Sequence, residues 1–104
     1  MASYVLDPCV EEELWDIWAY IAKHNPDAAT RVIEAVRETF SALAENPGLG
    51  SSRTFRNPRV RDIYCRPVSG FDRYLVFYRK LPGGIQVVHV FHVARKIERL
   101  FKKR

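Results

Sequence analysis

The side chains best suited to chemistry are arginines and lysines in the second half of the chain, interleaved with aromatic residues. The basic members are Arg53, Arg56, Arg59, Arg61, Arg66, Arg73, Arg79, Arg95, Lys96 and Arg99. The interleaved rings are Phe55, Tyr64, Phe71, Tyr74, Tyr78 and His92. Arginine offers a forked set of donors to phosphate or carboxylate groups, and aromatic rings can stack on bases or pack against a partner. The chain has twelve arginines and five lysines, and this bias favours a recognition surface.

Metal-independent cleavage of RNA is a reaction that these residues could support. Attack of a ribose 2′-hydroxyl on the neighbouring phosphate needs a base, an acid and cations for the developing charge. The cations would be Arg73, Arg79, Arg95 and Lys96. His92 is the best-placed acid or base, because Tyr74 and Tyr78 would first need strongly lowered pKa values.

No metal or other cofactor is expected. His89 and His92 form an HxxH pair, but residues three apart on a strand point to opposite faces, and no further ligand lies beside them in the sequence. Cys9 and Cys65 form no CxxC pair and are expected to be reduced thiols. The sequence lacks the glycine-rich phosphate loops and the nucleophile elbow, and its carboxylates are spaced as on solvated helix faces.

The charge of the chain divides at Ser52. Residues 1–52 carry three basic and nine acidic side chains, a balance of −6, whereas residues 53–104 carry fourteen basic and three acidic ones, a balance of +11. This split predicts one surface that meets something anionic and another that does not.

Length and composition fit a single folded domain over residues 1–104. Hydrophobic residues make up 47% of the 104 positions, as in ordinary globular proteins. No stretch is long and apolar enough to cross a bilayer, and the start lacks the pattern of a signal peptide. A cytoplasmic protein without a membrane partner is therefore expected.

The first half predicts a short strand over residues 3–6 followed by two helices. Asp7-Pro8 and Asn25-Pro26 each combine an N-cap residue with a proline at the first helical position. Apolar residues then recur at helical spacing through residues 10–21 and 29–43. Because almost no loop separates the helices, they must fold back as an antiparallel hairpin, which carries nearly all the acidic charge.

The second half predicts a basic loop and a small antiparallel sheet. Residues 47–60 are rich in glycine, proline and arginine and are interpreted as a loop. The β-prone runs are Ile63–Val68, Tyr74–Lys80 and Ile85–Val93, and their short connections demand antiparallel neighbours. Residues 95–101 suit a short C-terminal helix, and residues 102–104 a frayed tail.

The expected fold is therefore of the α+β class, in the order β-α-α-β-β-β with a short C-terminal helix. The helical hairpin must lay its apolar stripes on one face of the sheet, which leaves the other face for function. Alternation along the strand over residues 74–80 predicts which side chains share a face. One face would hold Tyr74, Val76 and Tyr78, and the other Leu75, Phe77 and Arg79.

Several motifs, taken in order, resemble the RelE/ParE toxin superfamily of type II toxin–antitoxin systems. They are Leu-Trp-Asp-Ile-Trp-Ala-Tyr-Ile-Ala at residues 14–22, Asn-Pro-Asp-Ala-Ala at 25–29, Leu-Ala-Glu-Asn-Pro-Gly-Leu-Gly at 43–50, Tyr-Leu-Val-Phe-Tyr-Arg at 74–79 and Val-Phe-His-Val-Ala-Arg at 90–95. The resemblance covers about residues 3–101. It implies a toxin with this same fold and a cognate antitoxin as its partner.

Within the superfamily, one branch cleaves mRNA on the ribosome and the ParE-like branch poisons DNA gyrase. Where the ribonuclease branch has an arginine early in the strand over residues 74–80, this chain has Leu75, and near the C-terminal tyrosine of that branch it has Phe101. The resemblance is therefore closest to the ParE-like branch and implies a toxin that inhibits gyrase by binding. A ribosome-dependent mRNA interferase is the alternative, and a non-toxic toxin-like binding partner is a second one.

Site residues follow from these expectations. The target-facing set is Arg61, Arg73, Arg79, His92, Arg95 and Lys96, and a ribonuclease would use Arg73, His92, Arg95 and Lys96. The antitoxin is expected to present an acidic amphipathic segment that covers exposed apolar surface and part of the basic half, by a helix in a groove and by addition of a strand to the sheet. Trp15 and Tyr20 lie beside the main apolar stripe and are candidate antitoxin contacts, with core packing as the other interpretation.

Overall fold

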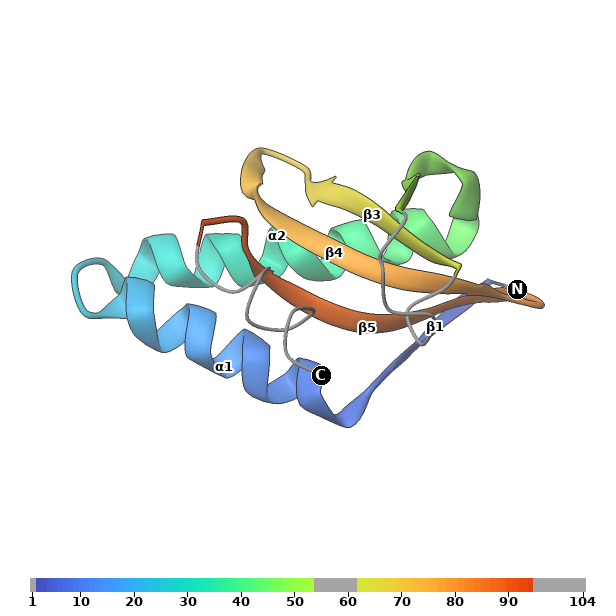
Figure 1. The fold of residues 1–104 in the computed structure, drawn as a ribbon. Helices are drawn as coiled ribbons and strands as arrows, with labels where there is room; N and C mark the ends of the chain where they lie inside the picture. Colours follow the sequence, from blue (N-terminus) through green and yellow to red (C-terminus); the bar gives the residue numbers. More distant parts are fainter. Residues whose placement is uncertain (1, 54–61, 95–104) are drawn as a thin grey trace.

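The structure, a computed structural model, describes residues 2–53 and 62–94 (Figure 1). Its elements are β1 (Ser3–Leu6), α1 (Pro8–Ala22), α2 (Pro26–Glu45), the 3₁₀ turn η1 (Pro47–Leu49), β2 (Ser51–Arg53), β3 (Ile63–Val68), β4 (Phe71–Leu81) and β5 (Gly84–His92). The predicted α+β order is confirmed, with η1 and β2 added where a loop was expected. The helix predicted over residues 95–101 and the tail over 102–104 lie outside the described residues.

Both helices begin at a proline, whose fixed φ and missing N–H suit the first helical position. Asn25 caps α2, because its Oδ1 accepts the N–H of Ala28 at 3.0 Å. Asp7 holds the N-cap position of α1 but makes no side-chain cap bond. Its Oδ1 instead accepts a hydrogen bond from Nε2 of Gln86 at 2.6 Å. The Asp7 carboxylate therefore ties the start of α1 to β5.

The five strands form one sheet in the order β1-β5-β4-β3-β2. β1 pairs with β5 in parallel, from Ser3 opposite Gly84 to Leu6 opposite Val87, and the other neighbours are antiparallel. The sheet is therefore mixed, and the expectation of a wholly antiparallel sheet was wrong for β1. A Cβ atom at residue 84 would collide with the backbone carbonyl of Ser3, so glycine permits this close approach.

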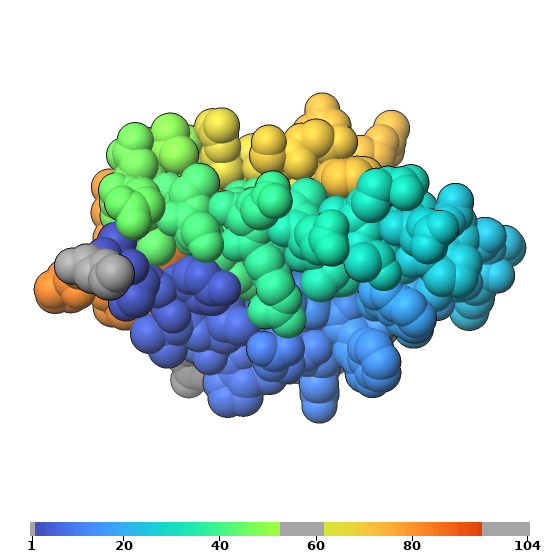
Figure 2. All heavy atoms as spheres, turned by 180° about the vertical axis from the view of Figure 1, so that it is seen from behind, coloured from blue at the N-terminus to red at the C-terminus, as the bar shows by residue number. Residues whose placement is uncertain are grey.

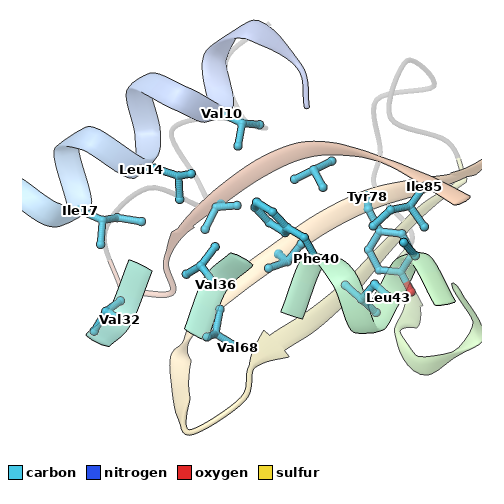
Figure 3. Packing of buried hydrophobic residues seen from close by; sticks show 14 residues of the cluster. Val10, Leu14, Ile17, Val32, Val36, Phe40, Leu43, Val68, Tyr78 and Ile85 are labelled. Carbon is cyan, nitrogen blue, oxygen red and sulfur yellow. The ribbon is translucent and has the colours of Figure 1, made fainter. Parts of the chain in front are cut away.

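The main core lies between the helical hairpin and one face of the sheet. Figure 2 shows α1 and α2 side by side over that face. The helices contribute Val10, Leu14, Ile17, Val32, Val36, Phe40 and Leu43, and the sheet contributes Val68, Val76, Tyr78, Ile85, Val87 and Val90 (Figure 3). These apolar side chains are removed from water, which is the main force that holds the hairpin on the sheet.

The opposite face of the sheet carries a second buried cluster. Its members are Ile63, Cys65, Leu75, Phe77, Val88 and Phe91, with Val93 packed against them. The predicted alternation along β4 is confirmed, since Val76 and Tyr78 face the helices while Leu75 and Phe77 face away. The expectation that this face would be left for function needs correction, because its middle is apolar and buried.

Tyr78 joins the main core to the turn that follows α2. Its side chain is fully buried. Its Oη donates to the carbonyl of Pro47 at 2.6 Å and accepts the N–H of Gly50 at 2.9 Å. Burial raises the pKa of the phenol above its ordinary value, so this tyrosine stays neutral and serves the fold.

Tyr78→Phe is expected to lower the free energy of unfolding by about 1–3 kcal/mol, because two backbone groups lose their partner while the ring remains. Urea unfolding followed by circular dichroism measures the change. Tyr20→Phe is the matched control, since the Tyr20 side chain is exposed and its change should stay within about 0.5 kcal/mol. Equal effects of the two substitutions would contradict this role of Tyr78.

Candidate functional site

The two arginines of the target-facing set that the structure describes lie at opposite ends of β4. Arg73 is exposed and Arg79 is half-buried. By alternation, both share the strand face of Leu75 and Phe77. Six residues of strand separate them, which corresponds to about 20 Å. They therefore flank the second apolar cluster rather than meet at one point.

His92 lies next to Arg73 in the sheet but on the other face. It stands opposite Tyr74 in the β4–β5 register, and the two rings meet edge to face with centroids 5.0 Å apart. Tyr74 packs against the helix-facing cluster, and cross-strand partners share a face. The N–H of Val93 donates to the carbonyl of Arg73 at 2.8 Å, so the backbones are neighbours while the side chains diverge.

The residues predicted for a ribonuclease are not brought together within the described part of the chain. Arg73 and His92 face opposite sides of the sheet, and Nδ1 of His92 accepts the N–H of Ala94 at 3.1 Å. Tyr78 has both hydroxyl contacts inside the fold and a raised pKa, the reverse of what a general base needs. Arg61, Arg95 and Lys96 lie outside the described residues.

A groove runs along the outer side of the helical hairpin. It has a volume of about 450 Å³ and is lined by Glu11, Glu12, Leu14, Trp15, Trp18, Ile33 and Arg37. Trp15 is 68% exposed, and its ring stacks on Trp18 with centroids 5.7 Å apart. An exposed tryptophan held by a second ring is a ready anchor for an apolar partner.

Tyr20, which was predicted together with Trp15 as an antitoxin contact, does not line this groove. Five residues along an α-helix correspond to a rotation of about 140°, so the two side chains leave α1 on different flanks. Tyr20 is 53% exposed, with the ammonium of Lys23 5.8 Å from the centre of its ring. Neither residue belongs to the main core.

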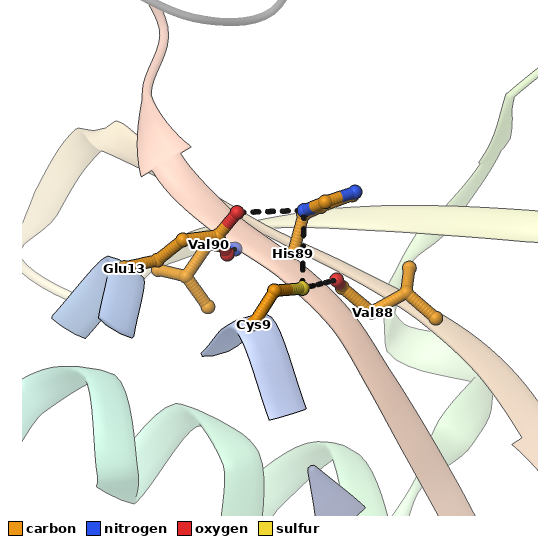
Figure 4. Close-up of polar contacts among 5 residues, drawn as sticks. All are labelled: Cys9, Glu13, Val88, His89 and Val90. Atoms are coloured by element: carbon orange, nitrogen blue, oxygen red, sulfur yellow. Dashed lines mark hydrogen bonds and ion pairs between the residues drawn. The ribbon is translucent and has the colours of Figure 1, made fainter. Parts of the chain in front are cut away.

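A third group of polar side chains joins α1 to the edge of β5 (Figure 4). Nδ1 of His89 lies 2.7 Å from Oε2 of Glu13 and 3.8 Å from Sγ of Cys9. The thiol of Cys9 donates to the carbonyl of Val88 at 3.3 Å, and Oε1 of Glu13 accepts the N–H of Val90 at 2.8 Å. The two helical side chains thus satisfy backbone groups of β5 where β1 no longer pairs with it.

This group was not predicted from the sequence, because no ligand lies beside His89 along the chain. Cys9 and Glu13 precede His89 by 80 and 76 residues. The available signal was the spacing of Cys9 and Glu13, which are four residues apart and therefore lie on the same face of a helix. Only the packing of α1 against β5 shows what that face meets.

Cys9 is not an activated nucleophile. Burial, with the negative charges of Glu13 and Asp7, raises the pKa of its thiol to about 11. A relay of the Cys-His-Glu kind needs the thiol and the carboxylate on different ring nitrogens. Here both approach Nδ1 of His89. The group is therefore three polar side chains that meet at one point, and not a catalytic triad.

Comparison with known families decides the identity of the chain. The model of the family described as "ParE toxin of type II toxin-antitoxin system, parDE" matches residues 4–97. The chain belongs to the ParE toxin family. The predicted resemblance to the RelE/ParE superfamily, with ParE as its closer branch, is thereby confirmed.

Two known proteins are similar to this ParE-family chain. The protein named "Putative toxin Y4kP" from Sinorhizobium fredii (strain NBRC 101917 / NGR234) is 32% identical over 77 residues, which are 74% of this chain and 73% of that protein. The solved structure titled "Chromosomal ParDE TA system from P. aeruginosa" has a TM-score of 0.69 at 17% identity, covering 89% of this chain and 97% of that one. That likeness confirms the fold of this ParE-family chain.

Among the described residues, this ParE-family protein has no helix that is both long enough and apolar enough to span a membrane. The longest, α2, has 20 residues, but it is amphipathic and carries charged side chains throughout.

Alkylation of Cys9 should be slow at neutral pH and should keep accelerating up to about pH 11. A thiol pKa of about 11, rather than the ordinary 9.0, leaves about 100-fold less reactive thiolate at pH 7.5. Rates of iodoacetamide modification at Cys9 in the metal-free protein, read by peptide mass spectrometry, test this between pH 7 and pH 10. The same protein unfolded in urea is the control, and a rate that levels off near pH 9 in the folded protein would contradict the prediction.

Proposed function

We propose that this ParE-family toxin arrests growth by binding DNA gyrase, and that a cognate antitoxin neutralises it. The proposal is supported by the divergence of Arg73 and His92 to opposite faces of the sheet. A nuclease needs acid, base and cation around one phosphate, whereas a binding protein can spread its contacts over a surface. The buried and neutral Tyr78 supplies no substitute base.

The basic second half supports an anionic target. Its balance of +11 would attract gyrase-bound DNA or an acidic protein surface and would raise the rate of association at low salt. Arg73 and Arg79 belong to the proposed target-facing set together with Arg61, His92, Arg95 and Lys96. Because Arg73 and Arg79 lie at opposite ends of β4, they would contact a broad surface rather than a single group.

One paired assay separates gyrase inhibition from the alternatives. Purified toxin is tested for inhibition of gyrase supercoiling and, in parallel, for cleavage of ribosome-bound mRNA. The proposal expects inhibition of gyrase without cuts in mRNA. Cuts in mRNA with normal supercoiling would identify an mRNA interferase, and no effect in either assay would identify a non-toxic binding partner.

Arg73→Ala and Arg79→Ala are each expected to weaken gyrase inhibition by about 10–100-fold, the usual cost of a lost charged contact. His92→Gln should weaken inhibition less than about tenfold, whereas loss of a general acid or base costs about 100–10,000-fold. The measurement is the toxin concentration that halves the supercoiling rate.

Arg31→Ala is the matched control for these arginines, since Arg31 is an exposed arginine of α2 on the acidic hairpin. Its inhibition should equal that of the wild type. A loss as large as that of Arg79→Ala would show that general charge, rather than the proposed surface, controls binding.

We also propose that the groove of the hairpin receives an amphipathic helix of the antitoxin. Trp15 supplies an exposed apolar anchor there, and helix-in-groove binding fits an apolar channel between two helices. Glu11 and Glu12 make the rim of the groove acidic. Nη2 of Arg37 lies 3.7 Å from Oε1 of Glu11 and offsets part of this negative charge. The acidic residues expected of the antitoxin should therefore contact the basic half of the toxin, and the apolar stripe of the antitoxin should enter the groove.

Trp15→Ala is expected to weaken antitoxin binding by about 10–100-fold, because it removes a large apolar anchor. Calorimetric titration of the antitoxin into the toxin measures the dissociation constant. Leu49→Ala is the control, since Leu49 is an exposed apolar residue in η1 away from the groove. Tyr20→Ala reports whether the antitoxin also reaches the other flank of α1. Unchanged affinity in Trp15→Ala would remove the groove from the proposal.

A further inference from the structure

Cys9, Glu13 and His89 offer one sulfur, one oxygen and one nitrogen atom to the same point in space. These three ligand atoms all lie within 4.8 Å of one another. Cys9 and Glu13 lie one helical turn apart on α1, and His89 approaches from β5 (Figure 4). We propose that these three side chains bind a divalent metal ion, with zinc as the preferred ion, at the junction of α1 and β5.

The distances suit a tetrahedral ion after a small adjustment. Zinc bonds of about 2.0–2.3 Å place pairs of tetrahedral ligand atoms about 3.3–3.7 Å apart. Sγ of Cys9 already lies 3.8 Å from Nδ1 of His89. Oε2 of Glu13 lies 2.7 Å from the same nitrogen and would have to move away by about half an ångström. A small rotation of the half-buried imidazole, whose side chain is 22% exposed, supplies this shift.

The surroundings already hold the ligands in place. Glu13 is 9% exposed, and its second oxygen, Oε1, accepts the N–H of Val90 at 2.8 Å. This bond would persist when Oε2 binds the ion and would fix the orientation of the carboxylate. The carbonyl of Val88, which now accepts the thiol proton of Cys9, would accept a hydrogen bond from a water in the fourth position.

The donor set selects the ion. A thiolate, an imidazole and a carboxylate together suit zinc or cobalt, whereas magnesium and calcium prefer oxygen ligands alone. On binding, the S–H bond of Cys9 breaks, its proton passes to solvent, and the sulfur electron pair forms the bond to the ion. The imidazole of His89 binds as the neutral tautomer, so the proton on Nδ1 that faces Oε2 of Glu13 moves through solvent to Nε2 and frees the Nδ1 electron pair for the ion. Nothing is oxidised or reduced. The bound ion would link the first turns of α1 to the part of β5 beyond its pairing with β1.

Cobalt(II) provides a direct test on the untagged, full-length wild-type protein. The proposal expects binding of one cobalt per chain, a thiolate-to-cobalt charge-transfer band in the near ultraviolet and tetrahedral bands in the visible, all removed by added zinc. Thermal unfolding should shift upward by about 10 °C when free zinc exceeds the dissociation constant about 100-fold. Absence of a sulfur-to-cobalt band would overturn the proposal.

Variants assign the ligands. Cys9→Ser should abolish the charge-transfer band, and His89→Gln, which can still donate to Glu13, should weaken cobalt binding at least tenfold. Cys65→Ser and His24→Gln are the matched controls, since Cys65 lies in the second apolar cluster and His24 is exposed at the hairpin turn. They should bind cobalt as the wild type does. A band that persists in Cys9→Ser, or disappears in Cys65→Ser, would overturn the assignment.

Discussion

The rest of the structure depends on how the backbone N–H and C=O groups along one edge of β5 find hydrogen-bond partners. β4 pairs with one edge of this strand from Gly84 to His92, but β1 covers the other edge only as far as Val87. Beyond that point the backbone of β5 would face the interior without partners, which is costly when polar groups are buried. Cys9 and Glu13 of α1 take over by bonding to Val88 and Val90. A helix therefore completes the hydrogen bonding of a strand.

This constraint positions the helical hairpin. Asp7, Cys9 and Glu13 each make a hydrogen bond to β5. Successive turns at the start of α1 are therefore held along the strand. Val10, Leu14 and Ile17 lie on the adjoining side of the helix and enter the core. The side turned toward α2 and solvent then carries Trp15 and Trp18, which line the groove. The edge of β5, the core and the groove thus use three faces of one helix.

The placement of charge follows from the same arrangement. Most of the acidic side chains lie on the hairpin, and the basic half of the sequence runs from the end of β2 onward through β3, β4 and β5. Because apolar clusters occupy the middle of both sheet faces, Arg73 and Arg79 are left at the two ends of β4. A surface of this kind suits contacts spread over a large partner better than chemistry on one bond. The division of charge along the sequence is therefore also a division between elements.

Local features could be predicted from the sequence because their causes lie within a few residues. The proline-led starts of both helices, the apolar stripes and the alternation along β4 depend on backbone geometry and on periods of 3.6 and 2.0 residues. The resemblance to the superfamily rests separately on five sequence motifs taken in order. The numbers of acidic and basic residues in each half of the sequence indicated the acidic hairpin and the basic half.

Tertiary structure alone decided which distant residues meet. Parallel pairing of β1 with β5 and the meeting of Cys9 and Glu13 with His89 join positions about 80 residues apart, and no local propensity encodes such a contact. The register of β5 shifts at Val88, so His89 stands opposite Phe77 while Val87 stands opposite Tyr78. Side-chain directions on a strand or helix follow from sequence, but the neighbour that each direction meets depends on how the whole chain packs.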